Sequence, residues 1–213
     1  MADAIKNLDF EAALNLRDPY FKSNYQMISS LQVTDKEVVN TCDDESTPAT
    51  TANKFTVGLI NVGAPCGGMN TANRAVVHYC LNRGHVIKGI FNGFSGLLAD
   101  DVRQLKWSDV DGWVSQGGSE LGTNRHVPED DSIGGESLGK TAMKLQEHRI
   151  DALVLIGGFE AFTALLQLSR SRHLYPAFAI PMICLPATVS NNVPGTDFSI
   201  GSDTALNSIM EMC

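Results

Sequence analysis

Apolar and polar residues alternate in two different rhythms from residue 55 to the end of the chain. Short runs rich in Val, Ile and Leu, bounded by Gly, Asn or Pro, predict buried strands at 55–62, 85–92, 151–158 and 180–187. Apolar residues at helical spacing predict helices over 69–84, 135–149, 161–172 and 204–213. Strands joined by crossover helices run parallel, so the predicted fold class is α/β, with a doubly wound, mostly parallel sheet.

The residues before this region have a different texture. Apolar side chains at helical spacing over 8–31, interrupted by Asp18 and Pro19, predict a helical connector that spans 1–33. Residues 34–54 are polar, rich in Thr, Asp and Asn, and have almost no apolar periodicity, which is typical of a flexible linker. The α/β domain is therefore expected to span 55–213.

Composition narrows the class of protein and its partners. Hydrophobic residues make up 43% and charged residues 19% of the 213 residues, which is ordinary for a soluble globular protein. A net charge of -8 argues against nucleic acid as a partner, because phosphate backbones favour basic surfaces. No apolar run has the length of a membrane span, and the first residues lack a signal-peptide pattern. We expect a cytoplasmic protein with no membrane partner.

The cysteines and histidines do not form a metal-binding pattern. Five cysteines, an odd number, are widely spaced, and none of them belongs to a C-x-x-C pair: Cys42, Cys66, Cys80, Cys184 and Cys213. The five histidines show no pairing at a spacing of four residues. This favours reduced thiols over a disulfide framework, and no metal site is predicted.

In a doubly wound sheet, ligands bind beyond the carboxyl ends of the strands. The loops to inspect are 61–70, 157–161 and 186–192, together with the Gly-rich segment 116–129, which contains Arg125. Taken singly, each loop has a purely structural explanation. The glycines allow tight turns, Arg125 can be a solvated surface residue, and Thr188 can be a turn residue or cap. Four such loops at one edge of a sheet favour a ligand site.

Four sequence blocks, in this order, resemble the phosphofructokinase family, and within it the C-terminal half of the eukaryotic ATP-dependent enzymes. The blocks read NVGAPCGGMNTANR, GGSELGTNR, IGGFEA and PATVSNNVPGTDFSIGSDTALN. The resemblance implies a phosphofructokinase-like fold, with the connector and linker joining two homologous halves. It also implies that the family's second α/β domain is absent from this chain, so that 55–213 is a truncated first domain of the C-terminal half.

Three loops depart from the pattern of the catalytic members of that family. Where those members read G-G-D in the first loop, this chain has residues 63–65, with Gly63 followed by Ala and Pro. Their G-G-D-G-S motif carries an aspartate that serves the magnesium of the nucleotide, and this chain has Phe159 there. Their T-I-D-N-D motif carries the aspartate that acts as general base, and Ser190 stands at that position.

These departures imply that the segment has no catalytic residue and needs no cofactor. The resemblance assigns magnesium and ATP to the parent enzyme. Neither Ser190 nor Asn192 can accept a proton at neutral pH. The resemblance then identifies Gly63, Gly157, Gly158 and Phe159 as parts of vestigial nucleotide loops.

Neutral donors in place of carboxylates would favour a bisphosphorylated sugar, because repulsion toward its phosphates is removed. The resemblance implies a site for the activator fructose 2,6-bisphosphate, made by Arg125, Thr188, Val189, Ser190, Asn191 and Asn192. It also implies two kinds of protein partner, an N-terminal catalytic half and other subunits of an oligomeric glycolytic enzyme. Two alternatives stay open: an active sugar-phosphate kinase domain, and a structural module with a vestigial pocket.

Overall fold

The computed structural model describes residues 54–128 and 136–213. The predicted connector (1–33) and all but the last residue of the predicted linker (34–54) lie outside these described residues.

The described residues form one five-stranded sheet in the order β3-β2-β1-β4-β5. The strands are β1 (Thr56–Val62), β2 (Val86–Ile90), β3 (Val102–Gln104), β4 (Ala152–Gly157) and β5 (Met182–Pro186). β1 pairs in parallel with β2 and β4, β4 pairs in parallel with β5, and only the edge strand β3 is antiparallel. The chain builds outward from β1 on one side and then on the other, so the order reverses between β1 and β4. The predicted mostly parallel sheet is confirmed.

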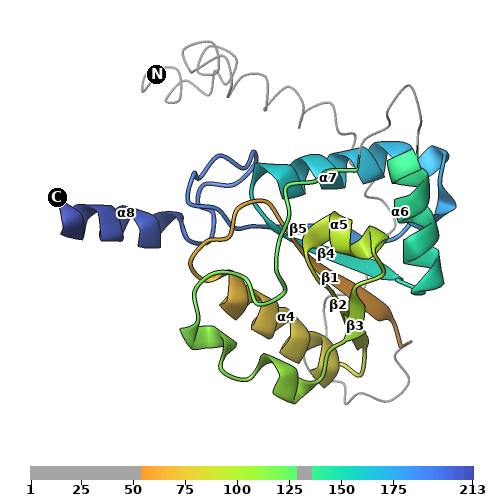
Figure 1. Ribbon diagram of the computed structural model, residues 1–213, viewed down its shortest axis with the longest axis horizontal. Helices are drawn as coiled ribbons and strands as arrows, with labels where there is room; N and C mark the ends of the chain where they lie inside the picture. Colours follow the sequence, from red (N-terminus) through yellow and green to blue (C-terminus); the bar gives the residue numbers. More distant parts are fainter. Residues whose placement is uncertain (1–53, 129–135) are drawn as a thin grey trace, which may run out of the picture. The chain divides into compact units, whose positions relative to one another are not determined.

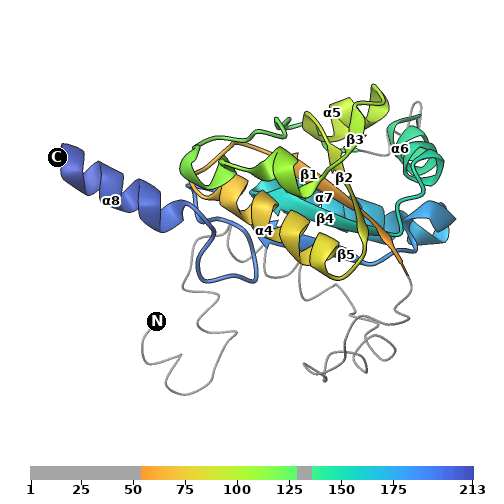
Figure 2. The same ribbon diagram turned by 90° about the horizontal axis from the view of Figure 1, so that it is seen from below.

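Helices cover both faces of the sheet, as Figures 1 and 2 show, with α4 on one face and α5, α6 and α7 on the other. The helices are α4 (Met69–Asn82), α5 (Gly93–Leu98), α6 (Glu136–Glu147), α7 (Phe159–Arg170) and α8 (Ser202–Met212). Short 3₁₀ turns span Trp107–Val110, Trp113–Ser115, Ser171–His173 and Pro176–Phe178. β1 is buried on both faces, which explains its unbroken apolar run.

Two elements were not expected from the sequence, namely α5 and β3. α5 has six residues, two of them glycines, so its own helix propensity is low. Its Phe94 and Leu97 are fully buried, and this packing against the sheet holds the helix. β3 has three residues and carries the exposed Arg103, which lies over the ring of Phe91 at 4.4 Å from its centre. Tertiary contacts therefore outweigh the local sequence in both elements.

One boundary matters for the site. The sequence predicted a loop at 157–161 and a helix from residue 161, but α7 already begins at Phe159. Phe159 and Glu160 therefore lie in the first helical turn, where a carboxylate is favoured by the helix dipole.

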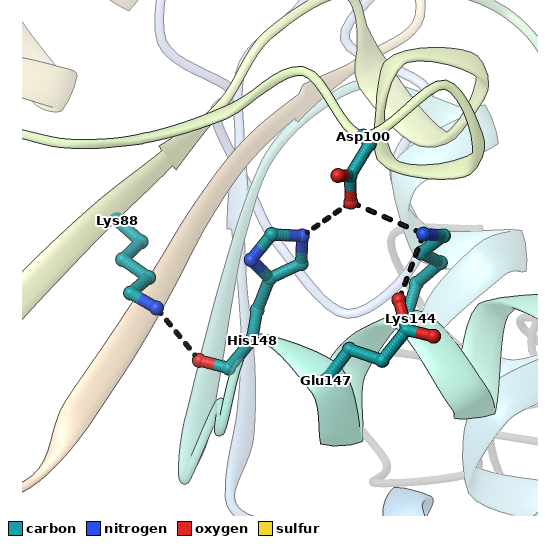
Figure 3. A network of polar contacts seen from close by, with 5 residues as sticks. All are labelled: Lys88, Asp100, Lys144, Glu147 and His148. Carbon is teal, nitrogen blue, oxygen red and sulfur yellow. Dashed lines mark hydrogen bonds and ion pairs between the residues drawn. The ribbon is translucent and has the colours of Figure 1, made fainter.

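A polar network on the α6 side of the sheet ties α6 to its neighbours (Figure 3). The Asp100 carboxylate accepts hydrogen bonds from His148 Nε2 at 2.9 Å and from Lys144 Nζ at 3.2 Å. Lys144 also bonds Glu147 at 2.7 Å, and Lys88 of β2 donates to the carbonyl oxygen of His148 at 2.9 Å. The hydrogen bonds from His148 and Lys144 lower the pKa of Asp100 below its ordinary value of 3.8. The network thus joins the end of α6 to the turn after α5 and to β2.

The close approach of β1 and β4 leaves no room for a side chain at Gly157. A Cβ there would overlap the carbonyl oxygen of Val62 and lie 3.1 Å from the Cβ of Ala161. We expect Gly157→Ala to lower the free energy of unfolding by about 3 kcal/mol, the upper end of the usual cost of inserting atoms into a packed interior. Urea denaturation measures this loss. Gly117→Ala is the matched control, because a Cβ at Gly117 meets nothing within 4 Å, and its effect should stay within about 0.5 kcal/mol.

The Asp100 network predicts a pH dependence of stability. Because the pKa of Asp100 is lower in the folded chain than its ordinary value, its ionised form stabilises the fold above pH 3.8. This stabilisation is lost as the pH falls through the folded-state pKa. We expect Asp100→Asn, which keeps the shape and tolerates the φ of 68°, to be less stable than the original chain near neutral pH. The difference should shrink in acid, as denaturant titrations at several pH values will measure; a difference that grows in acid would contradict this assignment.

Candidate functional site

The carboxyl ends of three neighbouring strands lie level with one another. Val62 at the end of β1 pairs with Gly157 at the end of β4, and Gly157 pairs with Pro186 at the end of β5. The turns that follow these strands therefore lie side by side at one edge of the sheet. The reversal of strand order between β1 and β4 falls at the same edge, which is where doubly wound sheets bind ligands.

The segment that carries Arg125 joins this edge through backbone pairing. Asn124 forms an isolated parallel bridge with Val62, and its carbonyl oxygen accepts the N–H of Gly63 at 2.9 Å. The hydroxyl of Thr123 donates to the carbonyl oxygen of Gly63 at 2.6 Å. These bonds attach residues 123 and 124 to the end of β1 and fix the backbone directly before Arg125.

Two buried asparagines hold the rest of the Gly-rich segment. Asn61 is fully buried and its Nδ2 donates to the hydroxyl oxygen of Ser119 at 2.7 Å. Asn70, also fully buried, donates to the carbonyl oxygens of Gln116 and Gly117 at 3.1 Å each, and its Oδ1 accepts the N–H of Glu120 at 2.7 Å. The sequence placed both asparagines in a candidate loop without giving either a role. One sequence signal points to them: Asn61 and Asn70 are the first and last residues of the candidate loop 61–70.

Arg125 faces a carboxylate that the sequence analysis did not assign. Its Nε lies 3.7 Å from Oε1 of Glu160, in the first turn of α7. The side chain of Arg125 is 73% exposed and that of Glu160 is 31% exposed. An ion pair this open contributes about 0–1 kcal/mol to stability, so the pair bears on the charge of the site more than on the fold.

The Glu160 carboxylate also fills the space between the turns after β1 and β4. A Cβ on Gly63 would lie 2.9 Å from Oε2 of Glu160, and a Cβ on Gly158 would lie 3.6 Å from the same oxygen. Gly63 adopts a φ of +99°, a conformation that favours glycine. Two of the predicted vestigial nucleotide residues, Gly63 and Gly158, therefore enclose a carboxylate of the chain itself.

The loop after β5 is held by two of its own side chains. Thr188 is 6% exposed, its N–H donates to the carbonyl oxygen of Ile200, and its hydroxyl accepts the N–H of Ser190 at 3.3 Å. Asn191 has a left-handed backbone with φ 47°. Its Oδ1 accepts the N–H of Ser199 at 2.8 Å and its Nδ2 donates to the carbonyl oxygen of Asp197 at 3.0 Å. Thr188 and Asn191 thus fix the shape of the loop.

The other residues of this loop face solvent. Val189 is 52% exposed, and Ser190 and Asn192 are exposed polar residues. Within the part of the chain that the structure describes, the side chains of Ser190 and Asn192 make no hydrogen bond. Their hydroxyl and amide groups are therefore available to a ligand.

Two of the predicted effector residues, Arg125 and Thr188, lie next to the start of α7. Thr188 lies beside Gly158, since a Cβ on that glycine would be 3.1 Å from the Cβ of Thr188. Arg125 reaches the same turn through Glu160. Phe159, the last of the four predicted vestigial residues, is partly buried, and the centre of its ring lies 6.5 Å from that of Phe162. The structure therefore brings Arg125 and the loop after β5 to one turn of the sheet edge.

The side chains at this edge include hydrogen-bond donors of three kinds. A guanidinium, a hydroxyl and an amide can each donate a hydrogen bond to phosphate or sugar oxygens. Over residues 54–128 and 136–213, no group of three or more His, Cys, Asp or Glu side chains could hold a metal ion. In the same residues, no helix is long and apolar enough to cross a membrane.

Known proteins resemble the chain over its whole length. Residues 56–213 match the family described as Phosphofructokinase. The chain is 45% identical over 214 residues to ATP-dependent 6-phosphofructokinase subunit beta of Candida albicans, covering 100% of this chain and 21% of that protein. It is 46% identical over 220 residues to ATP-dependent 6-phosphofructokinase of Aspergillus fumigatus, covering 100% of this chain and 26% of that protein.

A solved structure gives the same result for the fold. The crystal structure of Pichia pastoris phosphofructokinase in the T-state matches with a TM-score of 0.72 at 43% identity, over 100% of this chain and 21% of that chain. The chain therefore spans about a fifth to a quarter of the length of these relatives. The resemblance found in the four sequence blocks is confirmed, and the chain belongs to the phosphofructokinase family.

Proposed function

We propose that the chain acts within the regulatory half of an ATP-dependent 6-phosphofructokinase, the glycolytic enzyme that phosphorylates fructose 6-phosphate. In this proposal the segment transfers no phosphoryl group and binds the activator fructose 2,6-bisphosphate. The observation that carries the proposal is the neutral, hydrogen-bonding surface of the loop after β5. Ser190 and Asn192 stand exposed in this loop, and its Thr188 packs against Gly158, next to the Glu160 that Arg125 faces.

Catalysis would need carboxylates at two positions, those of Phe159 and Ser190, where this chain has none. A general base at the position of Ser190 would contribute about 10²–10⁴-fold to the rate, and a hydroxyl cannot take that part at neutral pH. Phe159, at the position where the family resemblance expects a metal-binding aspartate, offers no oxygen to a magnesium ion. Without the ion, the charge that develops on the transferring phosphoryl group is left without its main stabilisation.

The same substitutions favour binding. A phosphate next to Ser190 or Asn192 meets donors where an aspartate would repel it, and Arg125 supplies a permanent positive charge. The polar side-chain groups of Asn191 and Thr188 are already hydrogen-bonded within the loop. Their part in binding is to keep the exposed residues in place. A site of this kind retains a sugar bisphosphate without turning it over.

The proposal includes the context of a longer enzyme. Relatives are named as alpha and beta subunits of ATP-dependent 6-phosphofructokinase, which supports assembly with other subunits. We infer an N-terminal catalytic half as a further partner, magnesium and ATP bound there, and a cytoplasmic location. An active sugar-phosphate kinase and a purely structural module are the competing functions, and the next two experiments separate them from the proposal.

The purified chain should transfer no phosphoryl group from Mg-ATP to fructose 6-phosphate, because it has neither the base nor the metal ligand. A coupled assay measures this directly. Ser190→Asp should remain inactive while Phe159 stands at the metal position. Turnover that disappears in Ser190→Ala would mean that the chain is an active kinase.

Arg125→Ala should weaken fructose 2,6-bisphosphate by roughly ten- to a hundredfold, because a charge-assisted hydrogen bond to phosphate contributes about 1.5–3 kcal/mol. The measurement is the activation curve of the complete subunit at saturating ATP. Arg83→Ala is the matched control, since Arg83 caps the far end of α4 and should leave activation unchanged. If Arg125→Ala also leaves activation unchanged, the structural-module function takes the place of the proposed one.

A further inference from the structure

Arg125, the only cation assigned to the proposed site, is already paired with a carboxylate. Its Nε faces Oε1 of Glu160 at 3.7 Å. Glu160 is not among the residues that the family resemblance connects with a ligand. A negative charge next to the phosphate-binding cation needs an explanation, because it opposes the proposed function.

The position of this carboxylate is fixed by the fold. Glu160 lies in the first turn of α7, and its Oε2 fits between two glycines, Gly63 and Gly158, that leave it no neighbouring Cβ. The backbone before Arg125 is fixed too, through the bridge between Asn124 and Val62. Both partners are therefore presented by packed elements.

The geometry favours competition with the ligand over preparation of Arg125. An arginine that is oriented for phosphate is normally held through short, well-directed hydrogen bonds. Here the contact from Nε to Oε1 is 3.7 Å, too long for a hydrogen bond, and the Arg125 side chain stays 73% exposed. Glu160 thus adds little order to the guanidinium, whereas its charge acts on any anion that comes near.

We propose that Glu160 acts as an internal competitor for the phosphate bound by Arg125 and so sets the affinity of this site for anions. This inference rests on the proposed function for its ligand class, a sugar bisphosphate. A phosphate on Arg125 lies within a few ångströms of the Glu160 carboxylate. The repulsion between the two lowers the affinity for the phosphate by about three- to tenfold at this exposure.

The consequence is a lower occupancy by weakly bound anions. Glu160 weakens every anion at Arg125 by a similar factor, so it leaves the ratio of affinities between two phosphates unchanged. Inorganic phosphate, which has no other contact, then binds too weakly to occupy the site. A sugar bisphosphate that also reaches Ser190 and Asn192 gains enough from those contacts to stay bound.

The test is a double-mutant cycle on the chain, with inorganic phosphate and fructose 2,6-bisphosphate as probes in calorimetric and ³¹P NMR titrations. Glu160→Gln keeps the shape and removes the charge. We expect it to bind both probes about three- to tenfold more tightly than the original chain, with a gain that shrinks as salt is added. In the Arg125→Ala background, Glu160→Gln should give no gain. Glu211→Gln, an exposed residue of α8, is the control for total charge.

Several results would overturn the inference. One is a Glu160→Gln variant that binds inorganic phosphate no more tightly than the original chain, or not at all. Another is a gain in affinity of the same size when Arg125 is replaced by Ala. The third is a gain in affinity of the same size from Glu211→Gln. Thermal unfolding of Glu160→Gln verifies that the fold is kept. A failure of the proposed function looks different, because Glu160→Gln then gains affinity for inorganic phosphate through Arg125 while no variant prefers fructose 2,6-bisphosphate.

Discussion

The parallel pairing of β1 with β4 is the constraint on which the rest of the site depends. At the end of this pair, Gly157 lets the two backbones approach so closely that a side chain has no room. The level ends of the strands follow from that register, and so do the positions of the turns that begin at Gly63, Gly158 and Ala187. The Gly-rich segment then attaches to the same edge through Asn124. Remote parts of the chain meet because one backbone contact is tight.

The positive charge of Arg125 at this edge is balanced by the negative charge of Glu160. One guanidinium, one carboxylate and several neutral donors lie around the first turn of α7. The chain as a whole carries a net charge of -8, which gives no general attraction for phosphate. Recognition of an anion must come from the arrangement of a few groups. Under the proposed function, a change of one charge at the edge is therefore expected to alter the affinity for a phosphorylated ligand.

The sequence was sufficient for the main architecture because long apolar runs in a parallel sheet have few alternatives. All four predicted strands and all four predicted helices after residue 54 occur in the structure, with boundaries that differ by a few residues. α5 and β3 could not be found this way, since a glycine-containing turn and a three-residue edge strand have no periodic signal of their own.

The sequence limits the chemistry expected of a residue where residue type alone decides it, as with Ser190 and Arg125, and their roles in the site stay a prediction. A residue's role was missed where contacts between remote segments decide it. Asn70 anchors a segment 46 residues away, and Glu160 meets an arginine 35 positions before it, so neither role is visible in the local pattern. Glu160 was also assigned to a loop, because the tight approach at Gly157 that lets α7 begin early is a tertiary property.

The loop after β5 separates shape from chemistry along four consecutive residues. Thr188 and Asn191 form the bonds that close the loop, whereas the exposed side chains of Val189 and Ser190 between them take no part in these side-chain bonds. An exchange at an outward position changes what the loop can bind or catalyse and leaves its backbone intact. Such a loop can pass from one activity to another through single substitutions, without an unfolded intermediate in its evolutionary history.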